Sequence, residues 1–223
     1  MSKSGSARRE FGPNWTVGQA LDEVVSLSQG TDRGFTFIQP DRTENFYTFE
    51  DIREEAKRRG RHLLGLGLNK GDKLALVVPD AEEFILTFIA ATTVGIIPVP
   101  MYPPMSFGKL DSYVETAENI LAAADAKVLL TDTRVQSILW SLVDKVSTLD
   151  CILTVDKLDG PAPSGVEIPT VETEDTVFLQ FTSGSTSLPK GVVVTHQTLA
   201  ANLHAIMGPG LEMVPGEDVT VSW

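Results

Sequence analysis

The sequence predicts an α/β fold in which strands and helices alternate and most strands pair in a parallel sheet. Short apolar runs at 73–78, 127–131 and 151–155 have the length and composition of buried strands. Segments with helical apolar spacing separate these runs, which is typical of βαβ units. The chain has 223 residues, 42% of them hydrophobic and 22% charged, so it is long enough to bury a substantial core.

The N-terminal segment is expected to contain a tail, one helix and two short strands. Residues 1–14 are polar and are expected to be a disordered tail. Apolar residues at helical spacing predict a helix over 16–29. Aromatic and β-branched residues predict short strands at Phe35–Ile38 and Asn45–Thr48.

Capping signals mark the starts of the next two helices. Thr48 and Asp51 have the spacing of a capping box. Asp80 is a favourable N-cap residue, and Glu83 follows it at the third position of the expected helix. The elements predicted from here on are a helix over 49–66, a strand at 73–78, a helix over 80–93, a strand at 98–101, a helix over 109–124, a strand at 127–131, a helix over 134–146 and a strand at 151–155.

A run of chain-breaking residues indicates a boundary between two subdomains. Residues 158–165 are rich in glycine and proline, and residues 167–175 are acidic and polar. Such a shift in composition is typical of a linker. We therefore expect a first α/β subdomain over 15–172 and the start of a second, incomplete subdomain over 173–223.

The most informative stretch is the loop Thr182–Gly191, which contains five hydroxyls, two glycines and a lysine. Strand-like runs at 177–181 and 192–194 flank the loop. Farther along the chain, a helix is expected over 197–207 and a strand over 219–223. Small residues let backbone N–H groups approach a ligand, hydroxyls donate, and lysine adds charge, so the loop suits a polyphosphate. A Walker A loop is disfavoured because that motif continues from its lysine into a helix. A serine-rich turn without a ligand is the alternative.

The loop resembles the phosphate-binding loop of the adenylate-forming enzymes, which include acyl-CoA synthetases, fatty acyl-AMP ligases, peptide-synthetase adenylation domains and luciferases. Its continuation Gly191–His196 and Asn202 also fit, whereas Ser187-Leu188 departs from the glycine of many relatives. The segment Val99–Pro104, of the pattern Val-Pro-x-Tyr-Pro-Pro, is similar to fatty acyl-AMP ligases, and Tyr102 within it is a candidate to line an acyl tunnel. The resemblance covers the chain from about residue 16 to its last residue and implies the N-terminal part of the family's large domain.

The resemblance also implies the roles of the loop residues. They would bind the β- and γ-phosphates of ATP, with Lys190 as the catalytic residue that neutralises charge while pyrophosphate leaves. Gly184 and Gly191 would let the loop close and reopen. Mg²⁺ would bridge phosphate oxygens, with its protein ligand expected downstream of Trp223. The residues implied to bind the ATP cofactor are Thr182, Ser183, Gly184, Ser185, Thr186, Lys190 and Gly191.

The reaction implied is the joining of a fatty acid carboxylate to MgATP, which yields an acyl-adenylate and pyrophosphate. A transfer of the acyl group to an acyl carrier protein would follow. Two alternatives stay open: an acyl-CoA synthetase, and a natural truncated protein that binds a nucleotide or a partner without catalysis. The family's adenine- and ribose-binding segments and its small C-terminal domain are expected to lie beyond this sequence. The chain alone is therefore expected to be inactive, and the C-terminal part of a longer enzyme is an expected partner.

Composition and targeting signals exclude several other classes of function. The net charge of −12 disfavours binding to nucleic acid or to anionic membranes. The N-terminus lacks the apolar core of a signal peptide, and no apolar run reaches the length of a membrane span. A cytoplasmic location is the expectation. Cys151 is the single cysteine, so no intrachain disulfide is possible, and it is expected to be a core residue.

Other polar side chains are interpreted as structural. His196 is expected to start a helix rather than to act as a base, because no carboxylate lies nearby in the sequence. Arg58–His62 is interpreted as a solvated basic face. Three scattered histidines lack the spacing of metal ligands, so no metal site is expected. Glu82 and Glu83 are expected to point apart and to cap and solvate their helix.

Overall fold

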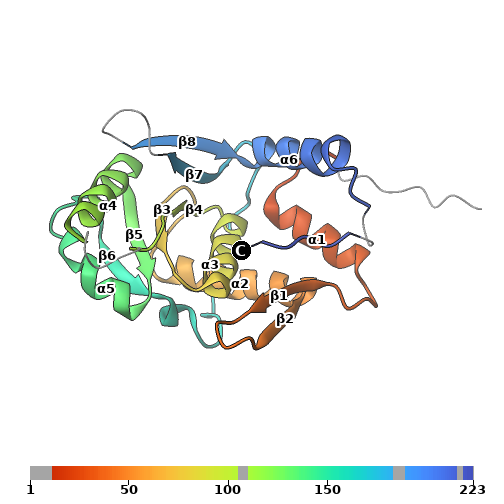
Figure 1. The fold of residues 1–223 in the computed structure, drawn as a ribbon, viewed down its shortest axis with the longest axis horizontal. Helices are drawn as coiled ribbons and strands as arrows, with labels where there is room; N and C mark the ends of the chain where they lie inside the picture. Colours follow the sequence, from red (N-terminus) through yellow and green to blue (C-terminus); the bar gives the residue numbers. More distant parts are fainter. Residues whose placement is uncertain (1–11, 105–109, 183–188, 215–217, 223) are drawn as a thin grey trace, which may run out of the picture.

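The structure is a computed structural model that describes residues 12–104, 110–182, 189–214 and 218–222 (Figure 1). The tail expected over 1–14 lies outside the described residues as far as residue 11, and residues 12–14 are exposed, without helix or strand. The elements are α1 (Val17–Leu27), β1 (Gly34–Ile38), β2 (Glu44–Thr48), α2 (Phe49–Gly65), β3 (Lys73–Val77), α3 (Ala81–Thr93), β4 (Ile97–Pro100), α4 (Leu110–Ala124), β5 (Ala126–Thr131), α5 (Thr133–Leu139), a 3-10 helix (Trp140–Leu142), β6 (Cys151–Thr154), a 3-10 helix (Val155–Leu158), β7 (Thr176–Thr182), β8 (Lys190–Thr195), α6 (His196–Ala205) and a π-helix (Ile206–Gly210).

The central sheet has four parallel strands, as the sequence predicts. Their order is β4-β3-β5-β6, so β3 lies between the strands that follow it in the chain. In the register of the sheet, Ala75 lies opposite Val99 on one side and Leu129 on the other. Each pair of neighbouring strands is joined through a helix or a helical turn, which is the connection that parallel pairing requires.

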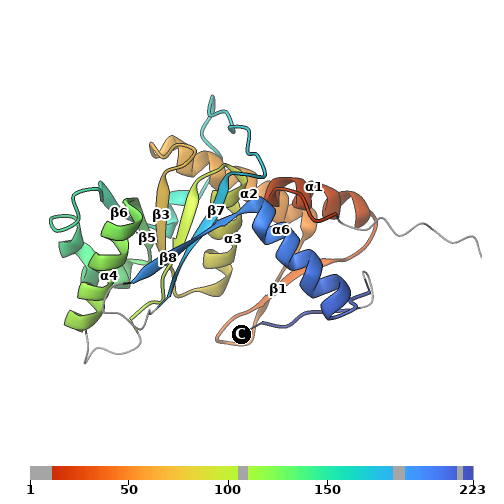
Figure 2. The ribbon, with the colours of Figure 1, turned by 90° about the horizontal axis from the view of Figure 1, so that it is seen from above.

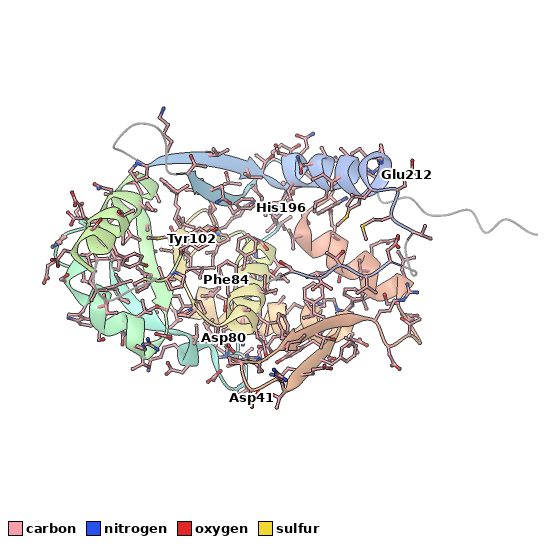
Figure 3. All side chains as sticks on the ribbon, in the orientation of Figure 1. Asp41, Asp80, Phe84, Tyr102, His196 and Glu212 are labelled. Carbon is pink, nitrogen blue, oxygen red and sulfur yellow. The ribbon has the colours of Figure 1, made fainter. Side chains whose placement is uncertain are left out.

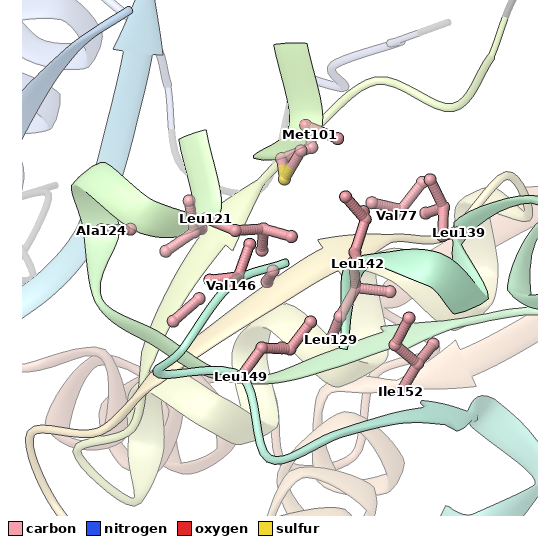
Figure 4. Packing of buried hydrophobic residues seen from close by; sticks show 14 of the residues in the cluster. Val77, Met101, Leu121, Ala124, Leu129, Leu139, Leu142, Val146, Leu149 and Ile152 are labelled. Atoms are coloured by element: carbon pink, nitrogen blue, oxygen red, sulfur yellow. The ribbon is translucent and has the colours of Figure 1, made fainter. Parts of the chain in front are cut away.

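Helices cover both faces of this sheet, and successive residues of β3 point to opposite faces. Leu74 and Leu76 pack with α2 and α3, whereas Ala75 and Val77 pack with α4 and α5. Figure 4 shows the second of these cores, the α4–α5 cluster, with residues of both helices closing over the strands. The α4–α5 cluster consists of Ala75, Val77, Val99, Met101, Ala117, Leu121, Ala124, Ala126, Leu129, Val135, Leu139, Leu142, Val146, Leu149 and Ile152.

Cys151 begins a strand, β6, as expected, but β6 lies at the edge of the sheet and Cys151 is only half-buried. It packs against the core on the α2–α3 side of the sheet. Burial, assisted by the nearby charge of Asp150, raises the pKa of its thiol. A raised pKa keeps the thiol protonated and unreactive, so the structural interpretation of this cysteine agrees with its surroundings.

The predicted helix starts are confirmed by their caps. The Thr48 hydroxyl accepts from the N–H of Asp51 at 3.1 Å, and the Asp51 carboxylate accepts from the N–H of Thr48 at 2.9 Å. The Asp80 carboxylate accepts from the N–H of Glu83 at 2.8 Å. These bonds satisfy N–H groups that a helix leaves without partners, and they fix where α2 and α3 begin.

Two predicted elements differ in the structure. The helix expected over 134–146 ends at Leu139 and continues as a 3-10 turn, because Leu142 and Val146 reach the core by tighter turns while keeping helical apolar spacing. The strand expected over 219–223 is absent from the described residues 218–222. Val219 and Val221 are exposed there, and no described strand lies beside them to complete a ladder.

The interpretation of Arg58–His62 as a solvated basic face is wrong for Arg59, which is 4% exposed. Its guanidinium lies between α2 and α3 and binds Glu55 at 2.6 Å, Glu83 at 3.1 Å and the Thr87 hydroxyl at 3.1 Å. Burial alone would lower the pKa of Arg59, but the hydrogen bonds to Glu83 and Glu55 outweigh it and raise the pKa. A buried charge is stable only with such partners, so this group is a structural clamp between the two helices.

Glu82 and Glu83 point apart, as expected, but Glu82 does not solvate its helix. It is buried, and its carboxylate accepts from Gln39 and Asn45 at 2.7 Å each and from the Tyr47 hydroxyl at 2.6 Å. The hydrogen bond to Glu82, together with burial, raises the pKa of Tyr47 to about 12. Glu82 thus holds the β1–β2 hairpin against α3.

Candidate functional site

The loop singled out by the sequence joins β7 to β8, which pair antiparallel, and its first and last residues belong to these strands. Thr182 pairs with Lys190, and this is the last pair before the turn. Because β8 begins at Lys190, a strand follows the lysine, which agrees with the exclusion of a Walker A loop. Four of the residues implied to bind ATP lie outside the described residues: Ser183, Gly184, Ser185 and Thr186.

The described residues at the base of the turn carry the groups that an anion requires. Thr182 and Lys190 are both exposed. Lys190 has no ion-pair partner among the residues that the structure describes. A hydroxyl and an ammonium without a described ion-pair partner therefore stand at facing positions on two strands, and both are groups that donate hydrogen bonds to anions.

The hairpin is seated beside the edge strand β4, and its side chains reach both cores. Val177 is buried, and the ring of Phe178 lies 5.7 Å from that of Phe88 in α3. Leu179 and Phe181 of β7 pack against the α4–α5 cluster. In Figure 1, β7 lies between β8 and the central sheet, and Figure 2 shows the same hairpin from above. The base of the hairpin is thus attached to the central sheet through β7.

A second set of contacts fixes the end of the hairpin opposite the turn. Asp175, just before β7, binds Lys70 at 2.6 Å, and Lys70 also donates to the carbonyl of Thr170 at 2.9 Å. Burial alone would raise the pKa of the Asp175 carboxyl. The hydrogen bond from Lys70 outweighs burial, so the pKa lies below its ordinary value. The backbone carbonyl of Asp175 accepts from the N–H of His196 at 3.1 Å, which joins the hairpin to the start of α6.

His196 is the first residue of α6 and is completely buried (Figure 3). Its Nδ1 accepts from the backbone N–H of Val17 at 3.2 Å, and its Nε2 has no hydrogen-bond partner among the described residues. Burial lowers the pKa of His196 to about 4, although the charge of Asp175 opposes the shift. The sequence does not reveal that a carboxylate lies near His196, because Asp175 is 21 residues earlier in the chain. A neutral, enclosed imidazole of low pKa is suited to hold α1 and not to take protons from a substrate.

Tyr102 follows β4 at the carboxyl edge of the parallel sheet, the edge at which open α/β sheets bind ligands. Tyr102 is 86% exposed. The hydroxyl of Tyr113, in α4, donates to the carbonyl oxygen of Tyr102 at 2.9 Å, and burial raises the pKa of Tyr113 to about 12. The contact holds the start of the Tyr-Pro-Pro segment, while the contribution of Tyr102 to an acyl tunnel stays a prediction.

Two structural features are absent from the described part of the chain. No group of three or more His, Cys, Asp or Glu side chains is arranged there to hold a metal ion. No described helix combines the length and apolar character that crossing a membrane requires.

The chain matches the family model described as AMP-binding enzyme over residues 29–223. It is 34% identical over 176 residues to a Caulobacter vibrioides protein whose name assigns it to the acyl-CoA synthetases. That match covers 78% of this chain and 30% of the relative.

Two solved structures share the fold. One comes from a study of fatty acyl-adenylate ligases of E. coli and L. pneumophila and matches with a TM-score of 0.80 and 27% identity, over 90% of this chain and 36% of that one. The other is McyG A-PCP complexed with phenylalanyl-adenylate, which matches with a TM-score of 0.76 and 28% identity, over 87% of this chain and 30% of that one. The chain thus spans about a third of the length of the proteins that it matches.

Proposed function

We propose that the turn of the β7–β8 hairpin binds the phosphates of ATP, because this chain belongs to the AMP-binding enzyme family. The observation that carries the proposal is the pair of Thr182 and Lys190 at the base of the turn, both exposed and with the lysine lacking a described ion-pair partner. The residues assigned to ATP are Thr182, Ser183, Gly184, Ser185, Thr186, Lys190 and Gly191.

The reaction proposed for the longer protein is the activation of a fatty acid. A carboxylate oxygen of the acid attacks the α-phosphorus of ATP, the bond to the bridging oxygen breaks, and pyrophosphate leaves with its negative charge. Lys190 stabilises the charge that develops on the leaving phosphates, and the turn orients them, so both act by position and electrostatics. Lys190 is the catalytic residue that we assign within this chain.

Magnesium would accompany ATP and neutralise part of the triphosphate charge. The residues at the turn suit the nucleotide better than the ion, because hydroxyls and an ammonium bind phosphate oxygens whereas Mg²⁺ prefers carboxylates. The described residues hold no acidic cluster for it. The role of Thr182 and Lys190 is therefore to bind phosphate oxygens directly.

The acceptor of the acyl group is proposed to be an acyl carrier protein. The segment Val99–Pro104 and the likeness to fatty acyl-adenylate ligases support this choice. McyG A-PCP, another structural relative, has a carrier domain in its name. The name of the Caulobacter vibrioides relative favours the alternative, an acyl-CoA synthetase that uses CoA as acceptor.

We also propose that residues 15–172 form one subdomain and that residues 173–223 begin a second one. The central sheet and the helices on both of its faces come from the first range. The β7–β8 hairpin and α6 come from the second range, after the linker rich in glycine and proline. The Lys70–Asp175 ion pair would then lie across the junction.

Titration of the 223-residue chain with MgATP and with pyrophosphate tests the phosphate site. We expect Lys190→Ala to weaken binding by about 10-fold, the lower end of the roughly 1.5–3 kcal/mol that a charge-assisted hydrogen bond contributes, because Lys190 is exposed to solvent. Lys157→Ala is the matched control: Lys157 is an exposed lysine whose nearest carboxylate, that of Asp156, lies 4.0 Å away. Equal affinities of wild type and Lys190→Ala would contradict the assignment of Lys190.

Product analysis with the protein from the complete reading frame tests the acceptor. The assay supplies MgATP and a long-chain fatty acid, with and without CoA. Accumulation of acyl-AMP in both cases supports the acyl-AMP ligase and directs the search to a carrier protein. Formation of acyl-CoA supports the alternative. Absence of either product, with the acid unchanged, contradicts the proposed reaction.

A further inference from the structure

Phe181 and Gly191 face each other across the hairpin, one pair before the base of the turn. A Cβ atom built on Gly191 would lie 2.9 Å from Cζ of Phe181 and 3.2 Å from each of its two Cε atoms. The ring therefore occupies the space that a side chain at position 191 would need. When an aromatic ring packs over a glycine on the neighbouring strand, the contact favours one register of the two strands over others.

The backbone of Gly191 does not itself require a glycine. Its φ angle lies outside the left-handed region, in contrast to that of Gly95, whose φ is +72°. Any residue adopts such a backbone without strain. The physical reason for a glycine at position 191 is therefore the approach of the Phe181 ring.

The ring of Phe181 also connects the hairpin to the core. It is half-buried and packs against the α4–α5 cluster, which includes Met101 of the segment after β4. One side chain thus contacts the opposite strand of the hairpin and the main hydrophobic core. The adjacent pair, Thr182 and Lys190, carries the described side-chain groups that are assigned above to phosphate binding.

We propose that Phe181 is a positioning residue for the phosphate-binding turn. Through its contact with Gly191 and the core, it fixes the spacing and register of β7 and β8, so that the Thr182 hydroxyl and the Lys190 ammonium reach the same phosphate group. The inference rests on the proposed function of the turn. It gives Gly191 a packing role, whereas the family resemblance implied a role in loop motion.

A double-mutant cycle on MgATP binding by the 223-residue chain tests the contact. Gly191→Ala is expected to raise the Kd about 10-fold, because the new methyl group displaces the ring. Phe181→Leu is expected to raise it about 3-fold, because the smaller side chain holds the strands less firmly. The double variant Phe181→Leu/Gly191→Ala is expected to bind more tightly than Gly191→Ala alone, because the methyl group then has room. Gly208→Ala, whose Cβ would meet nothing within 4 Å, is the control.

A second cycle separates positioning from loss of stability. In the wild-type background we expect Lys190→Ala to weaken binding by about 10-fold. In the Gly191→Ala background we expect it to weaken binding less than about 2-fold, because the ammonium is already displaced. A purely structural defect would lower the melting temperature and leave the cost of Lys190→Ala unchanged.

The possible outcomes are distinct. Fold changes at 181 and 191 that simply multiply, or an unchanged cost of Lys190→Ala, overturn the positioning role. A wild-type chain that binds neither ATP nor pyrophosphate contradicts the phosphate site itself. In that case the melting temperatures of the same variants test the contact. Additive shifts in melting temperature contradict coupling between Phe181 and Gly191, and non-additive shifts support it.

Discussion

At the scale of single residues, the chemistry of the turn could be predicted, whereas the buried polar contacts could not. Thr182 and Lys190 were identified because their type and order lie within one short segment. The burial of Arg59 and Glu82 depends on partners such as Thr87 and Gln39, which lie 28 and 43 residues away in the sequence. A charged residue on a helix looks the same in sequence whether it faces water or a partner helix.

His196 leads to a prediction about pH. The pKa of about 4 in the folded chain lies below the ordinary value of 6.5, because burial disfavours the charged imidazole; the charge of Lys70 lowers it further, and that of Asp175 opposes the shift. The unfolded chain therefore binds more protons between these two values, and the free energy of unfolding falls as the pH drops from 6.5 toward 4. The contribution of His196, up to about 3 kcal/mol, is fully present above pH 6.5.

Urea unfolding of His196→Asn across this range measures the effect, because the amide keeps an acceptor for the N–H of Val17 but does not titrate. We expect the variant to lose less stability than wild type as the pH falls. His204→Asn, at an exposed position of α6, is expected to follow wild type. If the free energy of unfolding of His196→Asn depends on pH as strongly as that of wild type, the prediction is wrong.

At the scale of elements, starts were more predictable than ends. The starts of α2 and α3 follow from caps within three residues, namely Thr48 with Asp51 and Asp80 with Glu83. The end of α5 depends on the core that Leu142 and Val146 reach, which is a tertiary constraint. The order β4-β3-β5-β6 likewise follows from packing of the whole sheet, and alternation along the chain does not determine it.

The contact between α2 and α3 gives a prediction for Gly60. In the interior of a helix, alanine is usually more stable than glycine by up to about 1 kcal/mol. Here a Cβ atom on Gly60 would lie 2.4 Å from Cγ1 of Val94 and 3.4 Å from the carbonyl of Ala90. We expect Gly60→Ala to lower the free energy of unfolding by roughly 1–3 kcal/mol, since the two helices must separate.

Denaturant titration measures this change, with Gly18→Ala as the matched control. Gly18 lies in α1, and its Cβ would meet only Thr16 Oγ1 at 3.9 Å. The control is expected to equal or exceed wild type in stability. A stabilising effect of Gly60→Ala would show that α2 and α3 have room to adjust.

At the scale of the whole molecule, two opposing features govern self-association. The net charge of −12 makes copies of the chain repel one another. Opposing this, β8 pairs only with β7 among the described strands and carries Val192 and Val193, which are 51% and 61% exposed. An unpaired edge with exposed β-branched residues favours association with another chain.

The 223-residue chain is therefore expected to associate more strongly as salt is added, because salt screens the repulsion but not the apolar contact. Sedimentation velocity at low and high ionic strength measures this. Val193→Lys is expected to weaken association at high salt, since it places a charge on the outer strand of the hairpin. Ile38→Lys adds the same charge at a position of β1 that is 72% exposed, and it is expected to associate as wild type does. If both variants weaken association equally, the contact is not made by β8, and if neither does, association is not driven by these apolar residues.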